Sequence, residues 1–198
     1  MTNYSQAGQD LFVLGLINST NKHYFLDIGC WVPDTLNNTL LLEQNGWNGI
    51  SIDITDLSEE WKVRNSKFVA SDALIINYTE LLNSNNQPMI IDYLNIDIEG
   101  SGFRYQALKR VMESNRDFKI ITIEHDAYRG YSETERTPQR ALLTNKGYVL
   151  LCSDVCLGGN PFEDWWINPK YFKEEEYKHL MCSNTEYNEI LNKLKTNG

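Results

Sequence analysis

YFLDIGCWVPDTLNNT, residues 24–39, decides the fold that we predict for this chain. Its apolar first part is typical of a buried strand, and Asp27 and Gly29 stand where that strand ends. A turn around Pro33 follows, and Thr39 then supplies helix-capping chemistry before an apolar helical segment. In an open α/β sheet, this order of strand, loop and helix places the loop over the carboxyl end of the strand, where nucleotide-like ligands bind.

The composition is that of one globular domain. The chain has 198 residues, of which 41% are hydrophobic and 23% charged, enough for one core and short for two. We therefore expect a single domain over 1–198, with an N-terminal helical extension or lid at 1–22 and a C-terminal helical tail at 170–198. A formal charge of −9 without a basic stripe argues against a nucleic-acid partner.

Targeting features favour a cytoplasmic protein. No apolar run reaches the roughly 20 residues that span a bilayer, so we expect no membrane partner. The polar N-terminus lacks the pattern of a signal peptide, and four cysteines in such a chain predict free thiols rather than disulfides.

Strand-like and helix-like segments alternate along the chain. This alternation predicts an α/β fold, a Rossmann-like, mostly parallel seven-stranded sheet with helices on both faces. The expected strands are 24–28, 50–54, 67–71, 90–96, 118–123, 148–152 and 162–167. The expected helices are 11–17, 39–45, 56–64, 79–82, 103–113 and 139–145, with a loop at 127–138.

Acidic residues stand at the ends of the predicted strands. Because the carboxyl ends of parallel strands meet at one edge of the sheet, these side chains are expected to gather where such folds bind ligands. The six residues are Asp27, Asp53, Asp72, Asp97, Glu124 and Asp154.

Asp53 is the most informative of these acids. An acid at the end of the second strand commonly accepts both hydroxyls of an adenosine ribose, although a solvated carboxylate beside a helix cap at Asp56 is an alternative. A dinucleotide also needs the glycine pattern G-x-G-x-x-G, and no second glycine follows Gly29 closely. The site therefore suits an adenosine ligand without a pyrophosphate, such as S-adenosylmethionine.

Several motifs, in order, resemble those of FkbM-type methyltransferases. They are FLDIG (25–29), NNTLLLE (37–43), GWNGISIDI (46–54), DYLNIDIEG (92–100) and ITIEHD (121–126), with SQAGQDLFVL (5–14) and PFEDWWINP (161–169) similar to one branch. The resemblance implies a class I, S-adenosylmethionine-dependent O-methyltransferase that acts on a hydroxyl of a sugar or glycan. The chain departs from many relatives at 31–33, where they carry a glycine, and this leaves the shape of the loop open.

The resemblance also implies a cofactor site. In it, Asp27 and Gly29 shape the loop, Asp53 holds the ribose, and Asp72 with Ala73 lies against the adenine. Asn38 and Thr39, at a helix N-terminus, are expected to meet the carboxylate of the cofactor. Ile54 and Asp97 complete the predicted site, and Gln6 is expected in a lid with Ser5 and Asp10.

A hydroxyl acceptor calls for a general base or a metal ion. His125 is the first choice, since imidazole titrates near neutrality, and the alternative is that it only hydrogen-bonds a carboxylate. Glu99 is the second choice, and Asp97 and Glu124 complete the catalytic set. Asp97, Glu99 and Asp126 are the oxygen ligands for Mg²⁺, should a metal bind.

Two further clusters have more than one interpretation. Cys152, Cys156, His179 and Cys182 are spaced as zinc ligands, but cysteines in apolar strands are often core residues. The aromatic residues Trp165, Trp166, Tyr171 and Phe172 suit a sugar-stacking wall, a core or the face of a homo-oligomer. Since Trp165 and Trp166 alternate faces on a strand, at most one of them points to the pocket.

Two other functions compete with methyl transfer. One is a nucleotide-binding oxidoreductase or epimerase, which the missing glycine pattern disfavours. The other is a non-catalytic module that binds an adenosine ligand, or an interaction protein whose acidic edge binds a cationic partner.

Overall fold

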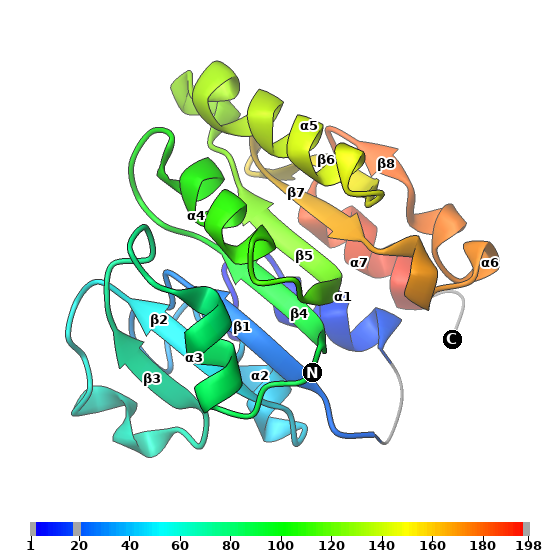
Figure 1. Ribbon diagram of the computed structural model, residues 1–198. Helices are drawn as coiled ribbons and strands as arrows, with labels where there is room; N and C mark the ends of the chain where they lie inside the picture. The colour runs from blue at the N-terminus through cyan, green and yellow to red at the C-terminus, as the bar shows by residue number, and fades with distance from the viewer. Residues whose placement is uncertain (1–2, 18–20, 196–198) are drawn as a thin grey trace.

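One eight-stranded sheet organises the molecule, which we describe from a computed structural model (Figure 1). The structure describes residues 3–17 and 21–195, so the first two residues, 18–20 and the last three residues of the predicted tail lie outside it. The strand order is β3-β2-β1-β4-β5-β7-β6-β8. Among the described residues, no helix is both long and apolar enough to cross a bilayer.

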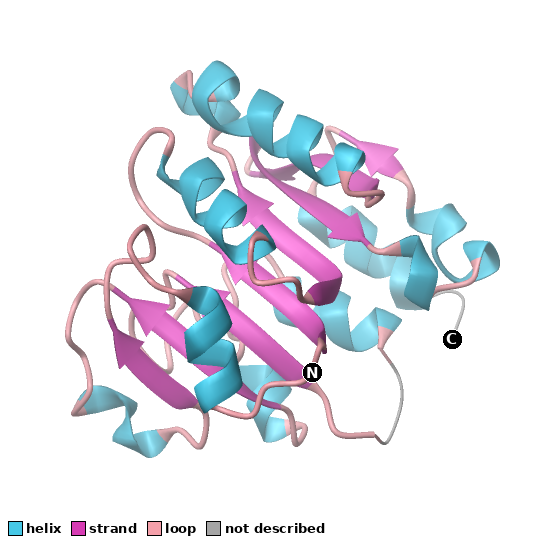
Figure 2. Cartoon of the chain, viewed as in Figure 1, coloured by secondary structure: helices cyan, strands magenta, loops and turns pink. Residues whose placement is uncertain are grey.

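The strands and helices have the following bounds (Figure 2). The strands are β1 Tyr24–Ile28, β2 Asn48–Asp53, β3 Lys67–Ala70, β4 Ile90–Ile96, β5 Asp117–Glu124, β6 Val149–Leu157, β7 Asn160–Ile167 and β8 Cys182–Ser183. The α-helices are α1 Gln9–Leu16, α2 Leu40–Gln44, α3 Tyr78–Ser84, α4 Phe103–Met112, α5 Thr137–Asn145, α6 Glu174–Tyr177 and α7 Tyr187–Lys195. Short helical turns are η1 Glu60–Val63, η2 Ala127–Arg129, η3 Ser132–Arg136, η4 Pro169–Tyr171 and η5 Lys178–Leu180.

The Rossmann-like α/β fold is confirmed, but the sheet has eight strands rather than seven. β1 to β5 run parallel through helical crossovers, whereas β7 pairs antiparallel with both β5 and β6. The additional strand, β8, lies in the tail that we expected to be helical and pairs parallel with β6. A strand of two residues is too short for the period-2 alternation that marks a strand in sequence.

Other boundaries also differ from the prediction. The segment 56–64 forms only the turn η1, and 127–138, expected to be a loop, holds η2, η3 and the start of α5. β6 continues past Cys152 to Leu157, with irregular pairing to β7 on the way. Asp154 is therefore inside a strand and not at its end.

Helices cover both faces of the sheet and bury two apolar layers (Figure 1). Helices α3, α4 and α5 pack on one face, and α1, α2 and α7 pack on the other. Adjacent residues of one strand point to opposite layers, as Phe25 and Leu26 do in β1. Trp165 and Trp166 divide in the same way and are both fully buried. They are core residues, so the sugar-stacking interpretation of this pair is wrong.

Candidate functional site

A cavity of about 730 Å³ opens at the carboxyl edge of the sheet, where β1 to β5 end. The position agrees with the expectation for an open α/β sheet. Ten of the predicted site residues line it: Gln6, Gly29, Asn38, Asp53, Ile54, Asp72, Ala73, Asp97, Glu99 and Glu124. Asp27, Thr39, His125 and Asp126 are not among the lining residues.

Gly29 allows the first loop to pass close to the end of β4. Its φ of 84° lies in the left-handed region, and a Cβ atom there would stand 1.8 Å from the main-chain oxygen of Asp97. The Gly29 N–H donates to the carbonyl of Ile52 at 2.8 Å. Only glycine fits this position, where the loop lines the cavity next to Asp97.

Asp27 and Thr39 support the loop from beneath the cavity. Both are fully buried, and the Thr39 hydroxyl donates to Asp27 at 3.1 Å while the amide of Asn95 donates at 2.9 Å. Burial raises the pKa of Asp27 to about 6, although these two hydrogen bonds act to lower it. The Thr39 N–H is already taken by the Asn37 side chain at 3.1 Å. The structure therefore favours a supporting role for Thr39 over its predicted contact with a cofactor carboxylate, and Asp27 supports the same loop.

Asn38, by contrast, lines the cavity and offers an acceptor. Its side chain is 5% exposed, and within the described residues its Oδ1 has no hydrogen-bond partner. A buried polar atom without a partner is costly unless a ligand or water satisfies it.

Asp53 fixes the turn that departs from the resemblance. One carboxylate oxygen accepts the Trp31 N–H and the other accepts the Thr55 N–H, each at 2.9 Å. Trp31 has a φ of 49°, and the indole N–H of Trp61 donates to its carbonyl at 2.8 Å. Each oxygen of the Asp53 carboxylate keeps a further lone pair, as two ribose hydroxyls require. η1 begins only at Glu60, so a helix cap near Asp56 does not account for Asp53.

An apolar slot lies beside Asp53. It is lined by Ile54, Ala73, Leu74 and Ile98, and Ile54 is 75% exposed. Asp72 holds the edge of this slot, since its Oδ1 accepts the Leu74 N–H at 2.8 Å. A flat heterocycle such as adenine suits a slot of this kind.

Asp97 and Glu124 form an acid pair at the ends of β4 and β5, which lie across β1 from Asp53 at the end of β2. Burial raises the pKa of both groups, and the neighbouring Asp97 charge raises that of Glu124 further. Glu124 is consequently the protonated member and donates its hydrogen bond to the Asp97 carboxylate. Arg104, fully buried, binds Glu124 and also Asp126. Two adjacent carboxyl groups that share one proton are an arrangement suited to acid–base chemistry.

Glu99 lies at the mouth of the cavity. Its side chain is 86% exposed and stands 3.5 Å from the Arg129 guanidinium, which also pairs with Asp126 at 3.3 Å. Glu99 is thus solvated and paired with an arginine, unlike the buried acid pair of Asp97 and Glu124.

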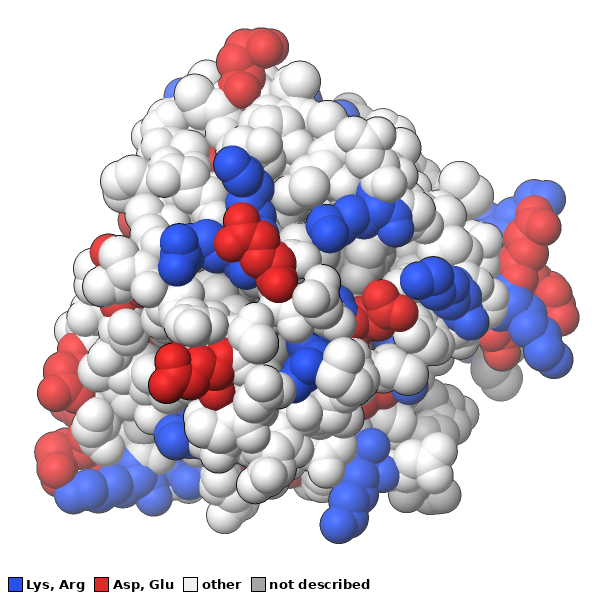
Figure 3. All heavy atoms as spheres, in the orientation of Figure 1, with Lys and Arg blue, Asp and Glu red and all other residues white. Residues whose placement is uncertain are grey.

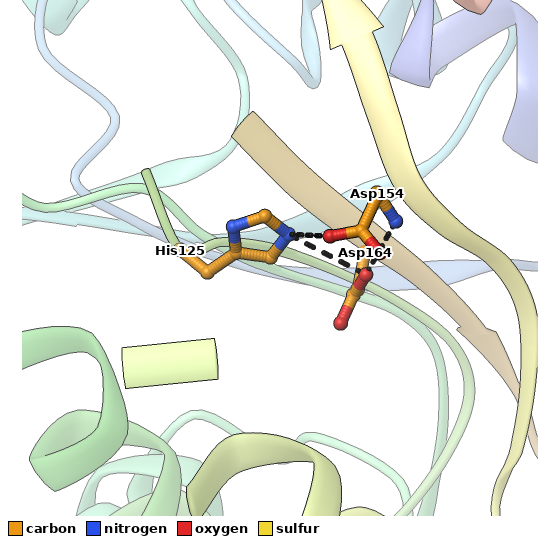
Figure 4. Close-up of side chains that lie close together, drawn as sticks. All are labelled: His125, Asp154 and Asp164. Atoms are coloured by element: carbon orange, nitrogen blue, oxygen red, sulfur yellow. Dashed lines mark hydrogen bonds and ion pairs between the residues drawn. The ribbon is translucent and has the colours of Figure 1, made fainter. Parts of the chain in front are cut away.

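His125 directly follows β5, is fully buried and is not among the residues that line the cavity; it faces Asp154 and Asp164 instead (Figure 4). Its Nδ1 accepts the Ala127 N–H at 3.1 Å, so Nε2 carries the proton. Nε2 faces Asp154 at 3.6 Å and Asp164 at 3.5 Å. This environment does not favour His125 as the base and matches the alternative of an imidazole that hydrogen-bonds carboxylates.

The His125 cluster is also a poor metal site. Among the described residues, one group of three has its possible ligand atoms within 4.8 Å of one another, and it consists of His125, Asp154 and Asp164. The predicted Mg²⁺ ligands Asp97, Glu99 and Asp126 form no such group. Arg140 binds Asp164 at 2.7 Å and Asp154 at 2.9 Å, and Arg136 binds Asp154 at 2.9 Å. Burial acts against ionised Asp164, but hydrogen bonds from Arg140 and His125 hold its pKa below the ordinary value. The arginines already neutralise the charge that a cation would need.

Several lining residues were not among the predicted site residues, although the loop at 31–33 was singled out in sequence. They are Cys30, Trp31, Leu36, Phe103, Tyr128, Arg129, Leu157, Asn160 and Phe162, with others of the strand ends. Because β7 runs antiparallel, its first residues return to the carboxyl edge of the sheet. The Gly158-Gly159 turn before β7 was the available signal, since it marks a hairpin.

Comparisons with known proteins support the fold. No protein-family model and no curated protein matches the sequence. The structure resembles the human methyltransferase 10 domain containing protein, with a TM-score of 0.51, 15% identity, and coverage of 81% of this chain and 78% of that one. It also resembles the METTL16 MTase domain, with a TM-score of 0.54, 14% identity, and coverage of 79% and 64%. A putative rRNA-methylase from Clostridium thermocellum has a TM-score of 0.50, 14% identity, and coverage of 85% and 99%.

At these identities the likeness concerns the fold alone. The chain has the Rossmann-like fold of class I S-adenosylmethionine-dependent methyltransferases. It spans 64% of the METTL16 domain.

Proposed function

We propose that this protein transfers a methyl group from S-adenosylmethionine to a hydroxyl group of a sugar or glycan. The observation that carries the proposal is one cavity with two chemically different ends. Asp53 and the apolar slot stand at one end, and the proton-sharing pair of Asp97 and Glu124 stands at the other. The class I fold supplies the expectation that such a cavity holds S-adenosylmethionine.

The residues present fit this cofactor. The two free lone pairs of Asp53 suit the ribose hydroxyls, and the slot beside Ile54 and Ala73 suits the adenine. The partnerless Oδ1 of Asn38 suits a donor such as the ammonium group of the methionine moiety. Gly29 lets the main chain approach, and the lack of a second glycine nearby leaves no cradle for a pyrophosphate.

Asp97 is the residue we propose as general base. When bound, S-adenosylmethionine supplies an electrophilic methyl group on a sulfonium. The acceptor hydroxyl must lose its proton as its oxygen attacks, and the ionised Asp97 accepts that proton. Glu124 donates a hydrogen bond to Asp97 and Arg104 holds Glu124, so the base is fixed in one orientation. Positioning of the acceptor supplies much of the remaining rate enhancement.

The acceptor class rests on the resemblance to FkbM-type enzymes and on the mouth of the cavity. Trp31, Phe103 and Tyr128 line it and are 57%, 44% and 45% exposed. Exposed aromatic rings beside a polar pocket suit the apolar face of a sugar ring.

The charge distribution does not favour an RNA acceptor, although one of the similar structures is that of a putative rRNA-methylase. The chain carries a net charge of −9. On the face covered by α3, α4 and α5, basic and acidic side chains are interspersed without a basic stripe (Figure 3). Binding to a phosphate backbone relies on Lys and Arg side chains that neutralise the phosphates, which clustered basic residues supply best.

Transfer of a labelled methyl group tests the proposal. The purified protein is incubated with methyl-labelled S-adenosylmethionine and with glycans, small polyols or RNA, with and without Mg²⁺. We expect label in at least one hydroxyl-bearing carbohydrate, and loss of that label in Asp97→Asn. Label in RNA alone would reassign the acceptor, and label in no acceptor despite cofactor binding would contradict catalysis.

A further inference from the structure

Two cysteines face each other at the far edge of the sheet from β3. Cys152 of β6 and Cys182 of β8 are register partners on adjacent parallel strands. Partners of this kind lie about 4.8 Å apart along the hydrogen-bonding direction, within the range of roughly 4.4–6.8 Å that a disulfide allows between Cα atoms. Both are free thiols in the structure.

The two thiols differ in their surroundings. Cys152 is fully buried in the apolar layer beneath α1 and α7, and its Sγ lies 3.5 Å from the Leu180 carbonyl oxygen. Cys182 is only half buried and packs at the border of the same layer. The Cys182 thiol is therefore accessible to a small reagent, whereas the Cys152 thiol is buried beside it.

Hydrogen bonding makes the accessible thiol the more acidic one. A hydrogen bond from Cys152, aided by one from Thr185, lowers the pKa of Cys182 to about 6 although burial opposes this. The bond to Cys182 and burial raise the pKa of Cys152. At neutral pH the thiolate, which is the nucleophilic form, resides on Cys182.

A zinc site does not explain the pair. Within the described residues, neither His179 nor Cys156 joins Cys152 and Cys182 in a group of three close metal ligands. Cys156 instead points to other partners, the Asp154 carbonyl at 3.3 Å and the Asn184 side chain at 3.6 Å.

We propose that Cys182 and Cys152 form a peroxide-reactive modification site, in which Cys182 is oxidised first and Cys152 captures the product as a disulfide. The Cys182 thiolate attacks a hydroperoxide, R–OOH, to give a sulfenic acid and an alkoxide, R–O⁻. The Cys152 thiol then attacks the sulfenic sulfur, so that the S–S bond forms and water leaves. The two thiols are oxidised by two electrons and the peroxide is reduced by two, which balances the reaction.

The disulfide would tie the C-terminal segment to the sheet. β8 pairs with β6 through two residues only, and α7 follows it. α7 packs against α1 and against Gly8, the residue just before α1, where a Cβ atom would stand 2.4 Å from Leu191. Gln6, two residues before Gly8, lines the cavity. Oxidation therefore stiffens the support of the N-terminal segment at the cavity.

Intact mass and peptide mapping test the proposal on the full chain. The reduced protein is treated with a stoichiometric amount of hydrogen peroxide at pH 7, and the remaining thiols are alkylated. We expect a mass loss of about 2 Da before alkylation, from the loss of two hydrogens, and a Cys152–Cys182 peptide. The oxidised protein should have a Tm higher by several degrees, because the bond closes a long loop.

Three variants make the assignment specific. Cys182→Ser should prevent the reaction, whereas Cys156→Ser, the matched control on β6, should leave it unchanged. In Cys152→Ala the reaction should end at a sulfenic acid on Cys182, which a dimedone probe labels. If this buried variant does not fold, peptide mapping of the unaltered protein still shows whether Cys152 and Cys182 become linked. Absence of the linked peptide, or a link to Cys156 instead, would overturn the proposal. None of these measurements requires S-adenosylmethionine, so their outcome is independent of the proposed methyl transfer.

Discussion

Replacing Gly29 with alanine should damage the protein far more than the same change at Gly46. The two glycines have the same left-handed backbone, with φ of 84° and 85°. They differ in their surroundings, because a Cβ atom at Gly29 would meet the Asp97 carbonyl whereas one at Gly46 would meet nothing within 4 Å. The comparison separates the cost of the backbone conformation from the cost of the close approach.

The magnitudes follow from these two contributions. A non-glycine residue in the left-handed region costs about 1–2 kcal/mol, and this applies to both variants. Overpacking in a tight interior costs about 1–3 kcal/mol more, and this applies to Gly29→Ala alone. We therefore expect the free energy of unfolding to fall by roughly 2–5 kcal/mol for Gly29→Ala and by roughly 1–2 kcal/mol for Gly46→Ala.

Urea denaturation followed by circular dichroism measures both values. At temperatures where Gly29→Ala remains folded, calorimetry should also show weaker binding of S-adenosylmethionine, since relief of the collision moves the loop away from β4. Gly46→Ala should bind as the unaltered protein does. Equal destabilisation of the two variants, or full cofactor affinity in Gly29→Ala, would refute the close approach of the loop to Asp97.

Three other predictions concern the carboxylates. Asp53→Asn should weaken cofactor binding by about 10- to 100-fold, as expected for lost hydrogen bonds to a charged group, while the exposed Asp56→Asn should not; calorimetry compares the two. Burial raises the pKa of Asp97 to about 6, so the rate of methyl transfer should rise with pH as Asp97 ionises. The rate should fall again near pH 9, where Glu124 loses its proton. Glu124→Gln should remove this upper fall, which a pH–rate profile measures. Burial raises the pKa of Glu163 to about 8, so the folded state holds a proton that the unfolded state releases above about pH 4.5, and stability falls as pH rises between these values. Glu163→Gln should consequently stabilise the protein by roughly 1–3 kcal/mol at pH 8 and not at pH 5, and urea denaturation at the two pH values tests this.

Much of the cofactor end of the site could be predicted from sequence because it depends on local patterns. The end of an apolar strand, a glycine and a downstream acid fix which residues reach the carboxyl edge in a parallel sheet. Gly29, Asp53 and Asp72 are of this kind, and all three line the cavity. The missing glycine pattern and the order of the motifs likewise led to the methyltransferase fold that the structural comparisons support.

The catalytic residues were harder to predict from sequence, because their roles depend on the face of the sheet to which the side chains at the end of a strand point. Glu124 and His125 are adjacent, and β5 ends at Glu124. Successive side chains of a strand alternate between the two faces of the sheet. An error of one residue in the predicted end of the strand therefore exchanges the side chain that lines the cavity for the one that points away from it. His125 is directed toward Asp154 and Asp164 instead. The Gly158-Gly159 hairpin brings β6 beside β7, but those acids reach His125 only because β7 pairs antiparallel with β5, and no local pattern encodes that pairing.

The most direct test of the account is isothermal titration calorimetry of the unaltered protein with S-adenosylmethionine, S-adenosylhomocysteine and NAD. We predict micromolar binding of the first two ligands and none of NAD, because the cavity has a ribose-binding acid but no cradle for a pyrophosphate. Binding of NAD in preference to S-adenosylmethionine, or binding of none of the three, would contradict the account.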